Sequence, residues 1–486
     1  MSSLDELKNI RIEKLKLLEK QGINPYPASS NRDYTISELI QNFDKISKKQ
    51  ESITIVGRIM AIRGQGGLVF FNLNDGTDKF QGLLKKDEMD EKIFDLFQNT
   101  IDIGDFVDIK GKLFITKRGE KTLQVEDWKI LTKSLRPLPE KWHGLADEEE
   151  RFRKRYLDII CNPEARDIIE KRAKFFSSMR RFLEEKGFME VDTPVLENTA
   201  GGAEAKPFVT HYNAYDTDVY LRISPELWLK RLMVAGFPKI YEIGRIFRNE
   251  GADAEHLQDY TQMEFYWAYA DYNDGMKLVE EMYKHIAEET FGTLKFKIKG
   301  FDIDLGGKWE KYDFVKLIKE KTDIDILSTN IKDVENKLRE LKVEYDKVGF
   351  NLNRGIDSLW KYCRKQLGGP GFLVNVPVSL EPLAKRREDD KNFVERFQVI
   401  LAGSEMGKGF SELNDPIDQA ERFGEQSKLR ESGDEEAQMT DNDFVEALEY
   451  GMPPTCGFGL SERLFSFLAD KPIRECQIFP FMRPKN

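Results

Sequence analysis

The chain has 486 residues and a mass of 56.5 kDa, enough for roughly two to four domains with sizeable cores. Its 75 basic and 86 acidic residues give a net charge of −11, which taken alone argues against a nucleic-acid partner. Hydrophobic residues make up 40% of the chain and 33 phenylalanines are present, which excludes a disordered protein. No apolar run is long enough for a membrane span or a signal peptide, so we expect a cytoplasmic protein with no membrane partner.

Sequence patterns for tightly bound metals and for P-loop nucleotide binding are absent. The four cysteines, Cys161, Cys363, Cys456 and Cys476, are far apart and form no CxxC pair, so they predict neither a zinc site nor a disulfide framework. Only four histidines are present, which disfavours a histidine-based metal site. No GxxxxGK[ST] loop occurs.

The first half of the chain predicts a small β-barrel behind a helical leader. Residues 1–50 have a rough helical stripe of leucines, interrupted by Pro25 and Pro27. Residues 51–144 then hold five short alternating strands separated by Gly and Asp turn signals, with a helical pattern after the third. This pattern favours an OB-type barrel.

The remainder, residues 145–486, predicts a large α+β domain. Pro137 and Pro139 break regular structure, so we place the boundary near Gly144. Long helices follow, and the segment FMEVDTPVL (188–196) predicts a strand with Pro194 inside it. Strands joined by short, hairpin-like spacings favour an antiparallel sheet over a doubly wound parallel one.

Two segments carry the chemistry. In KIYEIGRIFRNEGADAEHLQDYTQMEFYWAYADY (239–272), one strand leads to Arg248 and Glu250, a loop rich in Gly, Ala and Asp follows, and a second strand carries Glu264 and Tyr266. An arginine in such a strand–loop–strand can hold a phosphate, although a surface ion pair is the alternative. In residues 451–484, glycines on a strand let a ligand approach the backbone, and Arg463 begins the next helix.

These two segments resemble motifs 2 and 3 of the class II aminoacyl-tRNA synthetases, and GFMEVDTPVL resembles motif 1, which implies a homodimer. Within the class, the chain is most similar to the lysyl-tRNA synthetases and resembles a divergent branch of bacterial type. The resemblance extends over nearly the whole chain, through AGGAEAKPF, YLRISPELWLKRL, GFSELNDPIDQAERF and the terminal FPFMRP. It implies activation of L-lysine with ATP to lysyl-adenylate and transfer to the 3′ end of tRNA(Lys).

A buried substrate with two ammonium groups requires paired carboxylates. The resemblance implies that the lysine-binding residues are Gly202, Glu226, Glu264, Tyr266, Phe410 and Glu412. The three glutamates would face the substrate amines, the two aromatic residues would wall the pocket, and the glycine would lie beside it. For any single glutamate, an ordinary salt bridge is the alternative interpretation.

The same resemblance implies that the ATP-binding residues are Arg248, Glu250, His256, Tyr260, Glu405 and Arg463. Arg248 and Arg463 would be catalytic by neutralising charge, and Arg248 would bridge the α-phosphate and the lysine carboxylate. Tyr260 and Arg463 would sandwich the adenine, and Glu250 would read its amino group. His256, for which a solvated loop residue is the alternative, would meet the γ-phosphate together with Arg463.

A magnesium ion is implied at Glu405, with Gln398 as a weak second ligand. In the barrel, the resemblance implies that Phe70 stacks on the central anticodon uridine and that Arg63 and Gln81 read it. The alternative for Phe70 is a core position, because Phe70 and Phe71 are adjacent and one of them must point inward.

The chain departs from the lysyl family pattern at four places. Gln398 and Lys408 replace an acidic residue and an asparagine, and the Lys408 cation could grip the substrate carboxylate or point away. After His256 the chain reads Leu257-Gln258-Asp259-Tyr260, and motif 3 is one residue shorter, as GFGLSER. The last two forms lean toward the aspartyl and asparaginyl enzymes.

Three rival functions remain open. A ligase for aspartate or asparagine would place basic or amide groups around the substrate side chain, which Glu226 and Glu264 oppose. A catalytically silent synthetase paralogue that only binds RNA would have a damaged ATP site, whereas Arg248, Glu405 and Arg463 are all present. A ligase that lysylates a protein would typically lack the barrel.

Overall fold

The computed structural model describes residues 3–139, 147–251, 256–345, 347, 350–433 and 437–485. The chain divides into two compact units, Met1–Arg151 and Phe152–Asn486. The boundary predicted near Gly144 lies outside the described residues, so the segments 1–50, 51–144 and 145–486 remain predictions.

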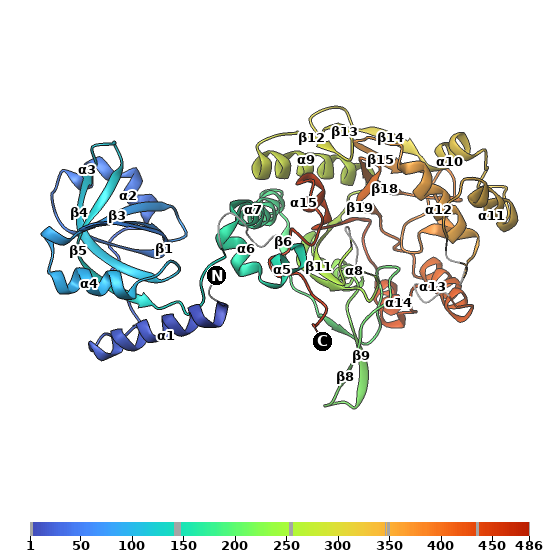
Figure 1. The fold of residues 1–486 in the computed structure, drawn as a ribbon. Helices are drawn as coiled ribbons and strands as arrows, with labels where there is room; N and C mark the ends of the chain where they lie inside the picture. Colours follow the sequence, from blue (N-terminus) through green and yellow to red (C-terminus); the bar gives the residue numbers. More distant parts are fainter. Residues whose placement is uncertain are drawn as a thin grey trace. The chain divides into compact units, whose positions relative to one another are not determined.

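The first unit contains a closed five-stranded barrel with strand order β1-β2-β3-β5-β4 (Figure 1). Its strands are β1 (Ile53–Gln65), β2 (Leu68–Asn74), β3 (Lys79–Lys85), β4 (Phe106–Ile115) and β5 (Lys121–Thr132). Between β3 and β4 lie the short η1 (Lys86–Glu88) and helix α4 (Glu91–Thr100), and α1 (Leu4–Lys20), α2 (Ile36–Gln41) and α3 (Phe43–Ser47) precede the barrel. The predicted OB-type barrel is confirmed, including the helix after its third strand.

Side chains of β2 alternate across the barrel wall, as the two-residue period of a strand requires. Val69, Phe71 and Leu73 are buried in the barrel core, so Phe70 lies on the outer side. Gly82 on β3 pairs directly with Phe71. A Cβ at Gly82 would lie only 2.1 Å from the Phe71 ring, so the ring packs over the glycine. Phe71 is therefore the core residue of the pair, and half-buried Phe70 is the outward one.

The second unit is built on an eight-stranded sheet of order β14-β15-β18-β19-β20-β11-β10-β6 (Figure 1). Its strands are β6 (Met189–Glu190), β10 (Lys239–Phe247), β11 (Asp259–Ala268), β14 (Glu310–Asp313), β15 (Gly371–Val374), β18 (Arg396–Leu401), β19 (Ser404–Ser411) and β20 (Thr455–Ser461). Neighbours are antiparallel except for the pairs β14–β15 and β10–β6. The predicted α+β architecture with an antiparallel sheet is confirmed.

Different helices pack on the two faces of this sheet. Helices α7 (Pro163–Glu185) and α9 (Tyr272–Phe291) share a core with Tyr241 and Phe265. Helices α8 (Glu226–Val234), α10 (Phe314–Thr322) and α12 (Leu352–Arg364) share a second core with Ile240 and Tyr266. Because side chains alternate along a strand, the face that carries Tyr266 also carries Glu264. The remaining helices are α5 (Glu148–Arg153), α6 (Arg155–Cys161), α11 (Ile331–Glu340), α13 (Pro416–Glu431), α14 (Asn442–Glu449) and α15 (Arg463–Leu468).

The single strand predicted over 188–196 is wrong. The structure has only two residues of strand at either end, β6 and β7 (Leu196–Glu197), with Pro194 between them. Proline cannot donate to a strand ladder, so the chain leaves the main sheet there. It then joins a separate three-stranded sheet, in which β9 (Thr217–Leu221) pairs with both β7 and β8 (Val209–Tyr212).

Short ribbons complete the unit. β12 (Lys295–Ile298) pairs with β13 (Phe301–Asp304), and β16 (Val376–Pro377), followed by the one-turn η2 (Val378–Leu380), pairs with β17 (Phe393–Val394). Across the described part of the chain, no helix combines the length and the apolar character needed to cross a membrane.

Candidate active site

A cavity of about 630 Å³ lies in the second unit, lined in part by Glu264 and Tyr266 of β11. It brings together every residue that the sequence predicts for the lysine, ATP and metal sites. These residues are Gly202, Glu226, Arg248, Glu250, His256, Tyr260, Glu264, Tyr266, Gln398, Glu405, Phe410, Glu412 and Arg463. Their individual roles remain predictions.

One wall of the cavity is a row of residues in register across four strands. Gln398 on β18 pairs with Lys408 on β19, Lys408 with Gly459 on β20, and Gly459 with Glu264 on β11. Directly paired residues point to the same face of a sheet. Because Gly459 has no side chain, the row is open between the ammonium-bearing side chain of Lys408 and the carboxylate of Glu264.

The glycines of β20 keep this wall clear. At Gly457, a Cβ would lie 2.1 Å from Oε1 of Glu412 and 2.6 Å from the Tyr266 ring. Glu412 and Tyr266 therefore require a glycine at this position, because any side chain would displace the carboxylate, while the approach of a ligand to this strand stays a prediction.

Three carboxylates lie together at the Glu264 end of this row. Glu226 begins α8, Glu264 lies on β11 and Glu412 directly follows β19, and their exposed fractions are 8%, 4% and 1%. Gly202, with φ +82°, brings backbone against this cluster, since a Cβ there would lie 2.8 Å from the Glu226 Cβ. The structure thus joins the glutamates that the sequence places 186 residues apart, from Glu226 to Glu412.

Glu264 is held by neutral donors. Its Oε1 accepts from Ser224 Oγ at 2.7 Å and from Gln262 Nε2 at 2.5 Å, and its Oε2 accepts from the Tyr266 hydroxyl at 3.0 Å. Burial, reinforced by the nearby charge of Glu226, raises the pKa of Glu264 to about 7. A buried carboxylate near neutrality is suited to receiving a cationic group.

Two of the residues that line the cavity are the arginines Arg248 and Arg463. Half-buried Arg248 follows β10 and directs Nε and Nη2 to the carbonyl oxygen of Ile223, both at 3.4 Å. Its guanidinium lies 5.7 Å from the centre of the Tyr260 ring. Arg463 begins α15, and its Nη1 donates to the carbonyl oxygen of Glu405 at 3.4 Å. Glu250 and His256 also line the cavity and are exposed, while residues 252–255 between them lie outside the described part.

The predicted metal position has one suitable carboxylate. Glu405 lines the cavity with a quarter of its side chain exposed, and its Oε1 accepts from Trp360 Nε1 at 2.5 Å. A single carboxylate fits Mg²⁺, which usually takes one or two carboxylates together with substrate phosphates. Gln398 fits poorly, because its Oε1 already accepts from Arg396 Nη2 at 2.7 Å. No cluster of three or more His, Cys, Asp or Glu within the described residues could hold a metal ion by itself.

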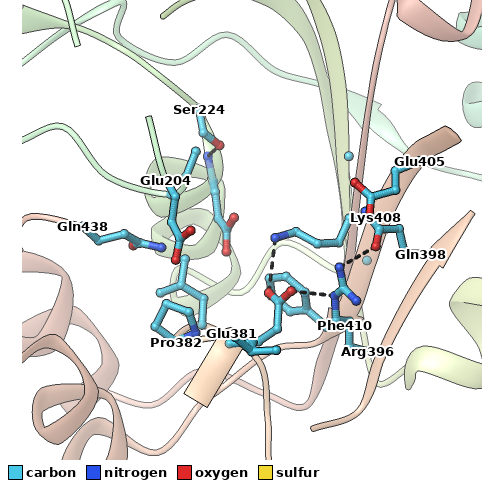
Figure 2. Close-up of a pocket in the computed structure, with 18 of the residues that line it drawn as sticks. Glu204, Ser224, Glu381, Pro382, Arg396, Gln398, Glu405, Lys408, Phe410 and Gln438 are labelled. Atoms are coloured by element: carbon cyan, nitrogen blue, oxygen red, sulfur yellow. Dashed lines mark hydrogen bonds and ion pairs between the residues drawn. The ribbon is translucent and has the colours of Figure 1, made fainter. Parts of the chain in front are cut away.

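Lys408 takes part in a charged network on the cavity wall. Figure 2 shows Lys408 and Arg396 converging on Glu381, with Nζ–Oε2 and Nε–Oε1 distances of 3.2 and 2.6 Å. Glu381 is 6% exposed, whereas almost half of the Lys408 side chain is exposed to the cavity side. Lys408 therefore lines the cavity while it pairs with Glu381 and not with Glu264.

The barrel places its three predicted anticodon residues on one outer face. Arg63 on β1 is directly opposite Phe70 on β2, and Gln81 on β3 is directly opposite Asn72. Asn72 and Phe70 are two residues apart, so all three predicted side chains share the side opposite Phe71. Gln81 Nε2 donates to Thr122 Oγ1 at 2.8 Å, which fixes its amide on that face.

Sequence reasoning missed several residues that shape the cavity. Lys230 is fully buried, and its Nζ lies 2.6 Å from Glu226 Oε1 and also contacts Glu412. The signal was present, since Glu226 and Lys230 have the i, i+4 spacing of a helical ion pair. Glu381 and Arg396 had no recognisable signal, because the fold alone brings these distant segments together.

Comparison with known proteins identifies the family. Residues 147–483 match the family model described as tRNA synthetases class II (D, K and N). The chain belongs to the class II tRNA synthetases. The barrel of this synthetase matches a second model, the OB-fold nucleic acid binding domain, over residues 53–131.

This synthetase also has full-length relatives. It is 45% identical to the lysine–tRNA ligase of Thermotoga maritima over 489 residues, which covers 99% of this chain and 97% of that protein. It is 45% identical to the lysine–tRNA ligase of Roseiflexus sp. (strain RS-1), covering 99% and 100%. For the lysine–tRNA ligase of Halalkalibacterium halodurans the identity is 44%, covering 99% and 98%.

Proposed function

We propose that the chain is a lysine–tRNA ligase, an enzyme that joins L-lysine to tRNA(Lys) with ATP. The observation that carries this proposal is the cluster of three buried carboxylates, Glu226, Glu264 and Glu412, inside the cavity of a class II synthetase. Buried cations require such partners, and L-lysine carries two ammonium groups. The full-length relatives named lysine–tRNA ligase support the same conclusion.

The first step forms lysyl-adenylate. The lysine carboxylate is already a nucleophile, so no strong general base is needed. Its oxygen attacks the α-phosphorus of ATP, the bond to the bridging oxygen breaks, and pyrophosphate leaves. Arg248 would neutralise charge at the α-phosphate and orient the lysine carboxylate, and Arg463 would neutralise charge toward the γ-phosphate together with His256.

ATP would be held through its base and its phosphates. Tyr260 and Arg463 would stack on the two sides of the adenine, and Glu250 would accept from its amino group. Burial raises the pKa of Tyr260, so its ring stays neutral at physiological pH. Mg²⁺ would supply further charge neutralisation at the phosphates, and Glu405 would hold it, with Gln398 at most a weak ligand.

The second step transfers lysine to tRNA. A terminal ribose hydroxyl, the 3′-hydroxyl in this proposal, attacks the adenylate carbonyl and releases AMP. The barrel would select tRNA(Lys) through a stack of the central anticodon uridine on Phe70, with Arg63 and Gln81 at its edge. Such a face works by stacking and amide contacts and needs little net positive charge, which is compatible with the acidic composition.

The assembly state and location belong to the same proposal. Large apolar side chains are exposed around the segment that resembles motif 1, among them Met189 at 44%, Leu196 at 49% and Val209 at 59%. Exposed apolar side chains of this kind are typical of a subunit interface, so we propose a homodimer. We also propose that it works in the cytoplasm. Light scattering coupled to gel filtration should give twice the mass of one chain.

Amino-acid-dependent exchange between ATP and pyrophosphate tests the proposed function. We expect exchange with lysine and background rates with the other nineteen amino acids. Exchange with aspartate or asparagine but not lysine would establish the first rival. The carboxylate cluster opposes that rival, because an anionic side chain would meet Glu226, Glu264 and Glu412. No exchange with any amino acid would favour a silent paralogue.

A further inference from the structure

Lys230 is a buried cation on the side of the carboxylate cluster away from the ligand. It lies on α8, one helical turn after Glu226, and none of its side chain is exposed. Among the described residues that line the cavity, Glu226 and Glu412 are present and Lys230 is not. Its ammonium contacts one carboxylate from α8 and one from the end of β19, and it lies 5.3 Å from the centre of the Phe410 ring.

The surroundings of Lys230 keep it charged. Burial lowers the pKa of Lys230, but the adjacent Glu226 and Glu412 more than offset this and raise it above its ordinary value. The causes of the pKa shift of Glu412 have the opposite signs. Burial raises the pKa of Glu412, the charges of Glu226 and Glu264 raise it further, and Lys230 is the group that lowers it. Lys230 thus lowers the proton affinity of Glu412, although the pKa of Glu412 stays well above its ordinary value.

The three carboxylates therefore differ in their partners. Glu226 and Glu412 share one internal ammonium, whereas the printed contacts of Glu264 are all with neutral donors, namely Ser224, Gln262 and Tyr266. With all three carboxylates ionised, the cluster and Lys230 would together carry two negative charges. The proposed substrate carries two ammonium groups.

We infer that Lys230 is a positioning residue, an internal counter-ion that bridges Glu226 and Glu412 and holds both carboxylates in place for a diammonium substrate. This inference rests on the proposed function and deepens it. Without Lys230, three buried carboxylates would lie together with no cation between them, and like charges so close take up protons until the repulsion is relieved. Lysine would then have to displace those protons before it could bind.

The charged and titratable groups that face this cluster come from four elements. They are Lys230 and Glu226 of α8, Glu264 and Tyr266 of β11, Glu412 after β19 and Cys456 of β20. Burial raises the pKa values of the Tyr266 hydroxyl and the Cys456 thiol well above their usual range, so neither titrates near neutrality. Changes in proton uptake between pH 6 and 8 therefore report on the glutamates.

The test is calorimetry of L-lysine binding to the full-length Lys230→Met variant at pH 7, in two buffers of different ionisation enthalpy. The buffer comparison gives the number of protons released on binding. We expect about tenfold weaker lysine binding or more, since each pKa unit above the assay pH costs about tenfold in the ionised form. We also expect more protons to be released than by the wild type, while ATP binding changes less than twofold.

Two further variants make the outcome specific. Lys230→Arg retains the charge and should release the wild-type number of protons even if its larger head group weakens binding. Lys284→Met is the matched control, because Lys284 pairs with Glu280 at 2.6 Å and the same i, i+4 spacing on α9, but both side chains are about a third exposed. It should behave like the wild type.

Three results would overturn the inference. The first is wild-type lysine affinity and proton release in Lys230→Met, and the second is an equal loss of lysine and ATP binding, which would indicate general damage. If Lys230→Met does not fold, extra proton release by a folded Lys230→Arg would be the third. Absence of lysine-dependent exchange in the wild type would instead refute the proposed function, so the two failures are distinguishable.

Discussion

Replacing Glu264 by glutamine should separate lysine recognition from ATP recognition. The substitution keeps the shape of the side chain, and Ser224 and Gln262 can still donate to its remaining oxygen. The Tyr266 hydroxyl, now facing an amide nitrogen, can turn and accept. What is lost is the negative charge that would face a substrate ammonium at a position that is only 4% exposed.

The size of the loss follows from that burial. Removing one partner of a buried, hydrogen-bonded charge pair costs about 2–5 kcal/mol, or roughly 30-fold to several thousand-fold in affinity. Because the pKa of Glu264 is about 7, the carboxylate is only partly ionised at neutral pH and becomes fully ionised above it. Wild-type KM for lysine should therefore fall as the pH rises from 6 to 8, and Glu264→Gln should remove this dependence.

Stability should change in the opposite direction. The folded-state pKa of Glu264 lies above its ordinary value of 4.5, so the group binds protons more readily in the folded chain. Its burial therefore costs nothing below pH 4.5 and up to about 3 kcal/mol above pH 7. Glu264→Gln should raise the free energy of unfolding at pH 8 by up to that amount, with no gain at pH 4.

Lysine-dependent pyrophosphate exchange at saturating ATP gives KM for lysine, and the converse experiment gives KM for ATP. We expect KM for lysine to rise at least 30-fold at pH 8 and KM for ATP to change less than threefold. Equal increases in both constants, or an unchanged pH dependence, would refute the role assigned to this carboxylate.

Three other substitutions test the rest of the site. Phe70→Ala should leave lysyl-adenylate formation unchanged and lower kcat/KM for tRNA(Lys) charging by about tenfold or more, since one base–aromatic stack contributes about 1–3 kcal/mol. Gly457→Ala should raise KM for lysine at least tenfold in the exchange assay, because its Cβ would displace Glu412, from which it would lie 2.1 Å. Gln398→Glu should tighten Mn²⁺ binding in the presence of a non-hydrolysable ATP analogue, measured by electron paramagnetic resonance, because a carboxylate offers a second charged oxygen besides the one that accepts from Arg396.

Matched controls are available in the same chain. Leu68→Ala removes another partly exposed apolar side chain from β2 and should not affect charging. Gly424→Ala adds a Cβ with no neighbour within 4 Å and should leave the lysine KM unchanged. A normal charging rate for Phe70→Ala, a normal lysine KM for Gly457→Ala, or unchanged Mn²⁺ affinity for Gln398→Glu would each contradict the reasoning for that residue.

The barrel and the antiparallel sheet could be predicted because their signals are local. Strand alternation and turn residues are readable along the chain, and in Phe70–Phe71 the alternation itself decides which ring is buried. The strand predicted at 188–196 is wrong because Pro194, which cannot donate to a strand ladder, lies inside it. The structure ends the pairing on both sides of that proline instead.

In the cavity, the residues within recognisable motifs could be predicted to share a site, but their counter-charges could not. Lys230 has the same spacing from Glu226 as many surface ion pairs, and only its complete burial distinguishes it. Glu381 and Lys408 come together through the pairing of β18 with β19 and the placement of the loop before them. Such long-range encounters depend on tertiary packing, which no local pattern encodes.

The row that runs from Lys408 through Gly459 to Glu264 gives the cavity a polarity of its own. Arg396 and Lys408 exceed Glu381 by one positive charge at one end, and the glutamates lie at the other, two strand spacings or roughly 10 Å away. An amino acid entering this field experiences a torque before it touches either end. In the proposed lysine–tRNA ligase, the amines of a zwitterion would be drawn toward the glutamates and its carboxylate away from them, so the wall would favour an orientation as well as a charge. Lysine amide, in which the carboxyl group is blocked, would lose that alignment even where both of its amines fit.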